Sequence, residues 1–308
     1  MICIECSAPT ETLYTEYSNK YVQLTECKNC HSEVDPYVEI DNVLLFIDLL
    51  LLKPGAYRHL VYNSMVVSLE SFKDHYKDQR RRLPYHKSTP RLKVSIKNIF
   101  NWFKKYDTII RLWVLLVVFE VYLTWVEEEE IYHTRERVPF NSVTLQLLMI
   151  YVNKWNALQQ YMFFLAYCVL DNVLFHMFTL RLVKSWMPWG KTTNYSSQIV
   201  SYTILLSQGV KIFPILMLIW PYDNIISMSI NKWIANLYLI ESMKIVTNSS
   251  YGSIMQLLVI VFLLRFIVLN ILVLALLSMI TGDNLINNVL VVLSQTYFGL
   301  RTFVSELL

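Results

Sequence analysis

Four of the five cysteines of this 308-residue chain fall within its first 30 residues, in two pairs of identical spacing. Cys3 and Cys6 form the first pair, 20 residues separate Cys6 from Cys27, and Cys30 completes the second pair. A C-x2-C pair places two sulfur atoms on one tight turn, and two such turns supply four thiolates to a tetrahedral ion. The spacing therefore predicts one structural zinc ion held by all four cysteines, in a closed site without a position for catalysis.

Two disulfides, or four unrelated thiols, are the alternative interpretation of these cysteines. The chain begins Met1-Ile2-Cys3 and shows no basic stretch followed by an apolar one, so we expect no cleavable signal peptide. This end of the chain is then expected in the reducing cytosol, where thiols bind metal more readily than they form structural disulfides. His31, next to Cys30, is an alternative ligand of lower weight.

The composition excludes an ordinary soluble globular protein. Hydrophobic residues make up 55% of the chain and charged residues 17%, whereas soluble domains carry about 25% charged residues. Residues 1–107 hold 28 charged side chains, but the much longer remainder, 108–308, holds only 23. The six glycines are too scattered for G-x-G-x-x-G or a Walker loop, which excludes the common phosphate cradles.

The regions around and directly after the cysteines must position them. Residues 1–35 are predicted to form a small β zinc ribbon, because β-prone stretches at 13–17 and 21–25 flank a turn. Residues 36–63 contain an apolar run at 43–52 that is too short to cross a bilayer, which needs about 20 residues. We expect this run to form an interfacial or a docked helix.

A proline and a glycine follow the apolar run 43–52. Pro54-Gly55 is expected to end the helix, since proline cannot continue the hydrogen-bond ladder and glycine suits a C-terminal cap.

Residues 64–107 form a basic linker and an amphipathic juxtamembrane helix. Within them, 71–106 carry 11 Lys or Arg against two acids, and apolar residues recur at helical spacing over 91–105. This basic charge has two interpretations. It is a topogenic cluster in a solvated linker, or it is a surface that binds anionic lipid.

Residues 108–308 are predicted to form an all-α, multi-pass transmembrane bundle of four or five helices. The uncertain helix is 225–246, which is markedly more polar than the others. The four remaining spans are expected at 108–126, 157–183, 199–220 and 253–280.

The basic stretch before the first span predicts a cytosolic N-terminus. If 225–246 crosses the membrane, the C-terminus is lumenal; otherwise it is cytosolic. Asn248-Ser249-Ser250 is a glycosylation acceptor sequence that only the second topology would expose to the lumen.

Ionisable residues inside the spans are costly and are candidates for function. Asp171 and Arg265 lie deep within their spans and are expected to pair, most simply as structural glue between helices, or to contact a lipid or partner. The other such residues are Glu120, His176 and Lys211. No catalytic motif is present, so we expect a protein that is not an enzyme; an unrecognised site at Asp171 and His176 is the least favoured alternative.

The residues after the cysteines resemble the Arv homology domain. The match lies in the segments 34–39, 41–48 and 53–63, which read VDPYVE, DNVLLFID and KPGAYRHLVYN. Together with the paired cysteines, they make the chain similar to the Arv family, and to a fungal member of it. In that family Tyr57, Arg58 and His59 belong to the characteristic segment, so they are candidates for contact with a lipid or a partner.

The resemblance implies a lipid-homeostasis protein of the endoplasmic-reticulum membrane, with the Golgi membrane as a further location. Its implied roles are sterol transport and distribution, sphingolipid metabolism and glycosylphosphatidylinositol anchor assembly. Expected partners are membrane lipids, namely sterol, sphingolipid or a glycolipid precursor, together with glycosyltransferase subunits, and not nucleic acid. The alternative function is a non-catalytic scaffold or accessory subunit of a membrane-bound glycosyltransferase of anchor synthesis.

Overall fold

The computed structural model describes residues 1–17, 22–65, 67, 103–104, 106–134, 143–193, 195–211, 224–282, 286–292 and 294. The chain forms two compact units, each of which gathers separate stretches of sequence. Unit 1 consists of Met1–Leu116, Lys184–Phe213 and Asn231–Met255, and unit 2 of Val117–Val183, Pro214–Ile230 and Gln256–Leu308. The basic helix expected over 91–105 lies outside the described residues, apart from two positions.

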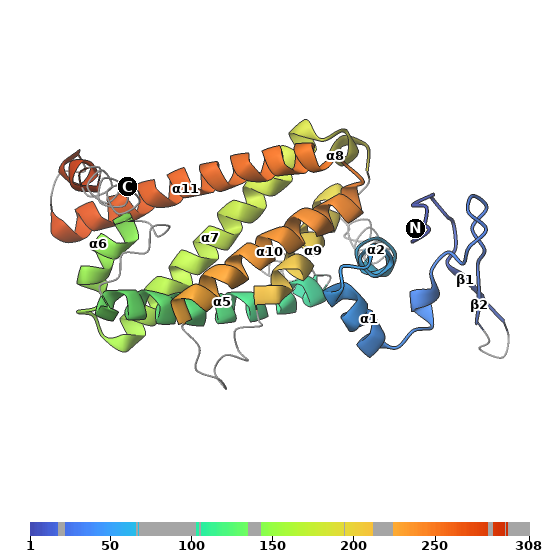
Figure 1. Ribbon diagram of the computed structural model, residues 1–308, viewed down its shortest axis with the longest axis horizontal. Helices are drawn as coiled ribbons and strands as arrows, with labels where there is room; N and C mark the ends of the chain where they lie inside the picture. Colours follow the sequence, from blue (N-terminus) through green and yellow to red (C-terminus); the bar gives the residue numbers. More distant parts are fainter. Residues whose placement is uncertain are drawn as a thin grey trace, which may run out of the picture. The chain divides into compact units, whose positions relative to one another are not determined.

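The N-terminal part of unit 1 is a small two-stranded module (Figure 1). Strands β1 (Tyr14–Glu16) and β2 (Val22–Leu24) pair antiparallel, with Tyr14 opposite Leu24. This hairpin confirms the two β-prone stretches predicted on either side of a turn. We call residues 1–35 the cysteine module.

Four short helical elements follow the cysteine module. They are the 3-10 turn η1 (Pro36–Val38), the helices α1 (Asn42–Leu50) and α2 (Pro54–Arg58), and the π-helical turn η2 (His59–Ser64). The short helix expected over the apolar run 43–52 is therefore present as α1, and its place at a membrane surface stays a prediction.

The role predicted for Pro54 is wrong. Helix α1 ends before it, and Leu52 turns the chain with a φ of 55°. Pro54 then occupies the first turn of α2, where its missing N–H would have had no partner and its fixed φ already suits a helix.

The rest of unit 1 surrounds one apolar cluster. Its buried members are Val61, Met65, Ile199, Tyr202 and Val246, which come from η2 and the residue after it, from α9 (Ser196–Gln208) and from α10 (Asn224–Thr247). The first turns of α5 (Asp107–Thr134) and the region of α8 (Pro188–Thr192) pack against it through Ile109, Leu112 and Trp189. In addition, the Tyr62 hydroxyl donates a hydrogen bond of 2.7 Å to the Val246 carbonyl.

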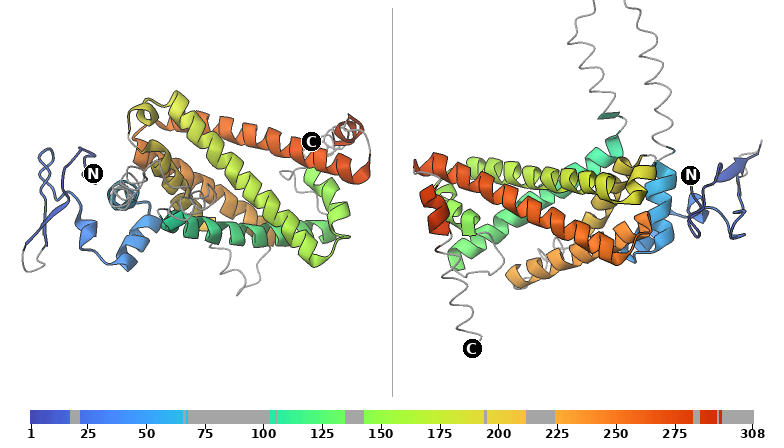
Figure 2. Two further views of the ribbon diagram at one scale, coloured as in Figure 1. Left: turned by 180° about the vertical axis from the view of Figure 1, so that it is seen from behind. Right: turned by 90° about the horizontal axis from the view of Figure 1, so that it is seen from above.

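Unit 2 is a helical bundle. It joins the later part of α5 to α6 (Val143–Val152), α7 (Ala157–Trp186) and α11 (Tyr251–Thr281), and Figure 2 shows α7 and α11 side by side. Aromatic rings hold neighbouring helices together: Phe175 stacks on Phe262 with centroids 5.7 Å apart, and Trp125 lies 5.2 Å from Tyr161.

Three helices of the described chain are long and apolar enough to cross a membrane, Ile109–Glu129, Ala157–Trp186 and Tyr251–Thr281. They coincide with three of the predicted spans and identify a membrane protein. The predicted span 199–220 begins within α9, but its second half lies outside the described residues. Residues 225–246 are helical in α10, and whether they cross the bilayer stays open, so the count of four or five remains a prediction.

The hydrogen bond between Tyr62 and Val246 predicts on which side of the membrane the turn between α10 and α11 lies. The elements joined by it should lie at one face of the membrane, so exposed Ser250 should share the compartment of the cysteine module. We expect Ser250→Cys to react with a membrane-impermeant maleimide in sealed vesicles whenever an N-terminal tag is accessible to protease. Ile286→Cys, beyond the far end of α11, should react only after permeabilisation.

The parent chain supplies the background labelling of its own cysteines. Labelling of Ser250→Cys in vesicles that protect the N-terminal tag would show that this turn faces the opposite compartment.

Candidate functional site

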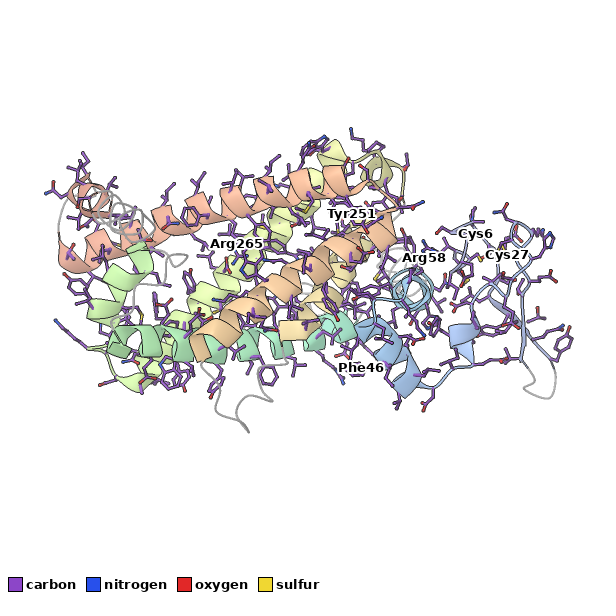
Figure 3. The ribbon with its side chains drawn as sticks, viewed as in Figure 1. Cys6, Cys27, Phe46, Arg58, Tyr251 and Arg265 are labelled. Atoms are coloured by element: carbon purple, nitrogen blue, oxygen red, sulfur yellow. The ribbon has the colours of Figure 1, made fainter. Side chains whose placement is uncertain are left out.

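The four N-terminal sulfur atoms lie together in the cysteine module. All four lie within 4.8 Å of one another, with 3.7 Å between the sulfur atoms of Cys3 and Cys30 and 3.6 Å between those of Cys6 and Cys27. In a tetrahedral site with Zn–S bonds of about 2.3 Å, the sulfur atoms stand about 3.8 Å apart. A disulfide would require about 2.05 Å. The donor set therefore fits a tetrahedral thiolate-bound metal, and both of these contacts join one pair to the other; Figure 3 labels Cys6 and Cys27.

The two pairs sit on equivalent turns. The Ser7 amide donates to the Cys3 carbonyl at 3.0 Å, and the His31 amide donates to the Cys27 carbonyl at 2.9 Å. Ser7 and His31, 24 positions apart, both adopt a left-handed backbone with φ near 60°. His31 thereby turns its ring outward, 3.4 Å from a Glu26 carboxylate oxygen, so its place as an alternative ligand is not supported.

The electrostatic surroundings of the thiols differ. A hydrogen bond from the Asn29 side chain lowers the pKa of Cys6 to about 6, and the Asn29 backbone lowers the pKa of Cys27. Burial raises the pKa of Cys3 to about 12. A thiolate at Cys3 therefore needs a cation beside it, which a coordinated metal would provide.

A buried carboxylate joins the cysteine module to the helical elements that follow it. Asp35 is 0% exposed, and one of its oxygens accepts hydrogen bonds from Asn63 Nδ2 at 2.7 Å and from His59 Nδ1 at 2.8 Å. The other oxygen accepts from the Tyr37 amide at 3.2 Å. Since a carboxylate only accepts, His59 carries its proton on Nδ1. Asp35 thus ties the end of the module to η2.

Two further side chains bind the backbone of the module. Asn63 exchanges two hydrogen bonds with Ile2, accepting from its amide at 2.9 Å and donating to its carbonyl at 3.0 Å. Arg58 Nη1 donates to the carbonyls of Ile4 and Glu5 at 2.7 and 2.8 Å. These two carbonyls lie between the first two cysteines, so Arg58 holds the turn that carries them. We call Asp35, Arg58, His59 and Asn63 the clamp.

Close packing accompanies the clamp. A Cβ at Gly55 would stand 3.1 Å from Ile4 Cδ1 and 3.2 Å from Tyr37 Cε2, so the missing side chain lets α2 lie against the module. This reason differs from the helix cap predicted for Gly55. Tyr57 is 1% exposed, and its burial raises its pKa, so it fills the interior and has no surface to offer a lipid.

Asp48 anchors α1 on the same framework. It accepts a hydrogen bond of 2.8 Å from the Tyr37 hydroxyl and pairs with Lys53 Nζ at 2.7 Å. The hydrogen bonds from Lys53 and Tyr37 lower the pKa of Asp48, so its carboxylate stays charged. Burial raises the pKa of Tyr37 to about 12, which keeps its hydroxyl a donor.

The clamp contains two residues that sequence reasoning missed, Asp35 and Asn63. Arg58 and His59 had been singled out as candidates for contact with a lipid or partner, and the structure shows them bound within the chain; an external contact stays a prediction. The sequence signal that could have found Asn63 is a polar amide side chain close behind the apolar pair Leu60-Val61. The signal for Asp35 was its place next to Pro36, where an aspartate commonly begins a helical turn.

In unit 2, Arg265 and Asp171 form a bidentate pair between α11 and α7, with both carboxylate oxygens engaged by the guanidinium Nε and Nη2; Figure 3 labels Arg265. The Arg265 guanidinium also lies 5.8 Å from the centroid of Phe175. The expectation that these two charges pair is confirmed; a role in binding lipid or a partner stays a prediction. The Asn172 side-chain amide of α7 also donates a hydrogen bond to the Glu120 carboxylate of α5. Polar groups therefore join these helices at more than one place.

Known sequences match this chain over most of its length. The model of the Arv1-like family matches residues 2–243. "Protein ARV1" of Eremothecium gossypii is 47% identical over 271 residues, which cover 88% of this chain and 87% of the relative. "Protein ARV1" of Saccharomyces cerevisiae is 47% identical over 287 residues, 86% of this chain and 88% of the relative.

Similarity to a plant protein is confined to a shorter stretch. "Protein ARV 2" of Arabidopsis thaliana is 45% identical over 69 residues, which are 22% of this chain and 29% of the relative. No solved structure matches the chain.

The clamp predicts that Asn63→Ala frees the cysteine module. The substitution removes three hydrogen bonds and leaves part-buried backbone groups of Ile2 and the buried Asp35 carboxylate short of partners, at a cost of about 3 kcal/mol. Hydrogen exchange of residues 1–35 in the full chain should speed up. Asn42→Ala, at an exposed position, is the matched control. Unchanged protection of 1–35 in Asn63→Ala would disprove the clamp.

The ion pair predicts a stability effect in unit 2. Asp171→Asn leaves a cationic Arg265 in the bundle, so the purified chain should lose about 2 kcal/mol of stability. The exchanged double variant Asp171→Arg/Arg265→Asp should recover part of it, and Arg181→Gln, at an exposed site on α7, should change little. Thermal unfolding in detergent measures all four chains. If the double variant is no better than Asp171→Asn, the pair does not hold these helices.

Proposed function

Because the chain belongs to the Arv1-like family, we propose that it acts in lipid homeostasis in the endoplasmic-reticulum membrane. Its role is to promote the transport and distribution of sterol, with effects on sphingolipid metabolism and on glycosylphosphatidylinositol anchor assembly. The cysteine module faces the cytosol, and the Golgi membrane is a further location. The membrane helices and the 47% identity to fungal relatives over most of the chain support this assignment.

One structural zinc ion belongs to this proposal. Cys3, Cys6, Cys27 and Cys30 supply four sulfur donors at distances that suit a tetrahedral site. When bound, zinc stabilises the fold of the module and leaves no open position for a substrate. The clamp then transfers that rigidity to η2.

The single observation that carries the mechanism is the connection from the cysteines to the membrane helices. Arg58 holds the first cysteine turn, and two positions further on, Leu60 already packs on the apolar cluster of unit 1. Ile109, the first residue of a candidate span, packs on the same cluster. We propose that the module orders this segment at the membrane surface while the helical bundle handles the lipid.

The proposed role is not enzymatic. The least favoured alternative placed catalysis at Asp171 and His176, which lie five positions apart on α7 and therefore about 140° apart around the helix. Asp171 is also occupied by Arg265. These positions favour a structural role for Asp171.

Cysteine substitutions test the metal and the activity together. The purified full chain should contain about one zinc ion, and in vesicles it should accelerate the transfer of sterol or of a glycolipid precursor. Cys27→Ser should lose the zinc and most of the acceleration, because three ligands hold the ion poorly. Cys168→Ser, which removes the cysteine outside the cluster, should keep both.

The alternative scaffold role gives a different result. A chain that binds zinc, accelerates no lipid transfer and copurifies stably with a glycosyltransferase would replace lipid handling with scaffolding. A folded chain without zinc would overturn the metal assignment.

A further inference from the structure

Helix α1 exposes its apolar side chains and buries its charge. Its outer side, together with the residue after it, carries five large apolar residues that are 45–65% exposed: Val43, Leu44, Phe46, Ile47 and Leu51. Its inner side carries Leu45 and Asp48, which are 8% and 5% exposed. We call the five exposed residues the α1 face; Figure 3 labels Phe46 within it.

This arrangement is the reverse of a helix that faces water. A surface helix of a soluble protein turns its apolar stripe inward and its charges outward. Here the one charged residue within the helix, Asp48, is turned inward. Its carboxylate forms an ion pair with Lys53 and accepts a hydrogen bond from the Tyr37 hydroxyl. No member of the α1 face carries a polar side-chain atom, so the face suits a medium without hydrogen-bonding groups.

Helix α10 of unit 1 is joined to the end of α1 and exposes further apolar side chains. The Tyr238 hydroxyl of α10 donates a 2.7 Å hydrogen bond to the Leu50 carbonyl at the end of α1. Next to Tyr238 and one turn before it, α10 exposes Leu237 and Trp233, at 62% and 67%. Exposed apolar side chains on two joined helices indicate one continuous apolar environment.

The position of α1 along the chain places it near the membrane boundary. Ten residues separate it from Val61, which lies in the same buried cluster that Ile109 packs against. Ile109 begins a candidate span. A helix of nine residues is too short to cross the bilayer, but it can lie in the boundary between headgroups and acyl chains, about 5–10 Å deep.

We propose that the α1 face inserts into the lipid bilayer, in the leaflet on the side of the cysteine module. Its five side chains contact acyl chains, and half-exposed Lys53 lies at the level of the lipid phosphates. A protein partner is less suited to this face, because protein interfaces surround an apolar centre with hydrogen-bonding groups. The proposal is independent of which lipid process the protein serves, so it can fail or hold separately from the proposed function.

Photoreactive phospholipids test this contact directly. The purified full chain is reconstituted into phosphatidylcholine vesicles that contain a phospholipid with a diazirine in its acyl chain. After illumination, mass spectrometry maps lipid adducts along the chain. We expect adducts on the peptide that contains residues 42–51, and on peptides of α11 as the internal positive control.

A substitution within the face supplies the sharper measurement. Phe46→Asp should lower the adducts on residues 42–51 about tenfold, because a buried phenylalanine alone contributes more than that factor to an insertion equilibrium. Tyr14→Asp, at an exposed aromatic residue of β1, is the matched control and should leave them unchanged. Both variants should keep the metal content of the parent chain, since both positions are exposed.

Two results would overturn the proposal. One is the absence of lipid adducts on residues 42–51 while α11 is labelled. The other is equal labelling in Phe46→Asp and the parent chain. Crosslinks from residues 42–51 to a second protein chain, without lipid adducts, would assign the face to a protein partner instead.

Discussion

The Asp35 carboxylate is the constraint on which the N-terminal half of the structure depends. A charge that is wholly removed from water costs several kcal/mol unless donors surround it. The donors here are His59 and Asn63, side chains from η2, and the Tyr37 amide. The chain can therefore bury Asp35 only by folding residues 54–64 back onto the cysteine module, and a metal-binding motif becomes part of a larger unit.

The same contact links the sulfur cluster to the membrane helices. Residues of η2 face two ways: His59 and Asn63 bind the module, whereas Val61 and Tyr62 contact the cluster that includes Val246. A π-helical turn spreads side chains at an unusual angle, and such turns are frequent at functional sites. The sulfur cluster and the exposed apolar side of α1 thus belong to one compact arrangement, in which Asp48 holds α1.

Much of this could be predicted from the sequence, but only where the signal is local. Cysteine spacing predicted the sulfur cluster, and long apolar runs predicted three helices that are long and apolar enough to cross a membrane. The bonds of Asn63 could not be predicted. Asn63 lies 28 positions from Asp35 and 61 positions from Ile2, and residue spacing carries no information about contacts over such separations. Pro54 was misjudged because proline both stops one helix and begins the next.

The central claim is that the clamp and the metal cluster stabilise each other, and the rate of metal release tests it most directly. Zinc transfer from the purified full chain to a chromophoric chelator would be compared for the parent chain, Asp35→Ala and the exposed control Asp41→Ala. The account predicts that Asp35→Ala releases zinc at least about tenfold faster, since loss of two or more buried hydrogen bonds exceeds one decade in stability, while Asp41→Ala matches the parent. Equal release rates for all three chains would contradict it.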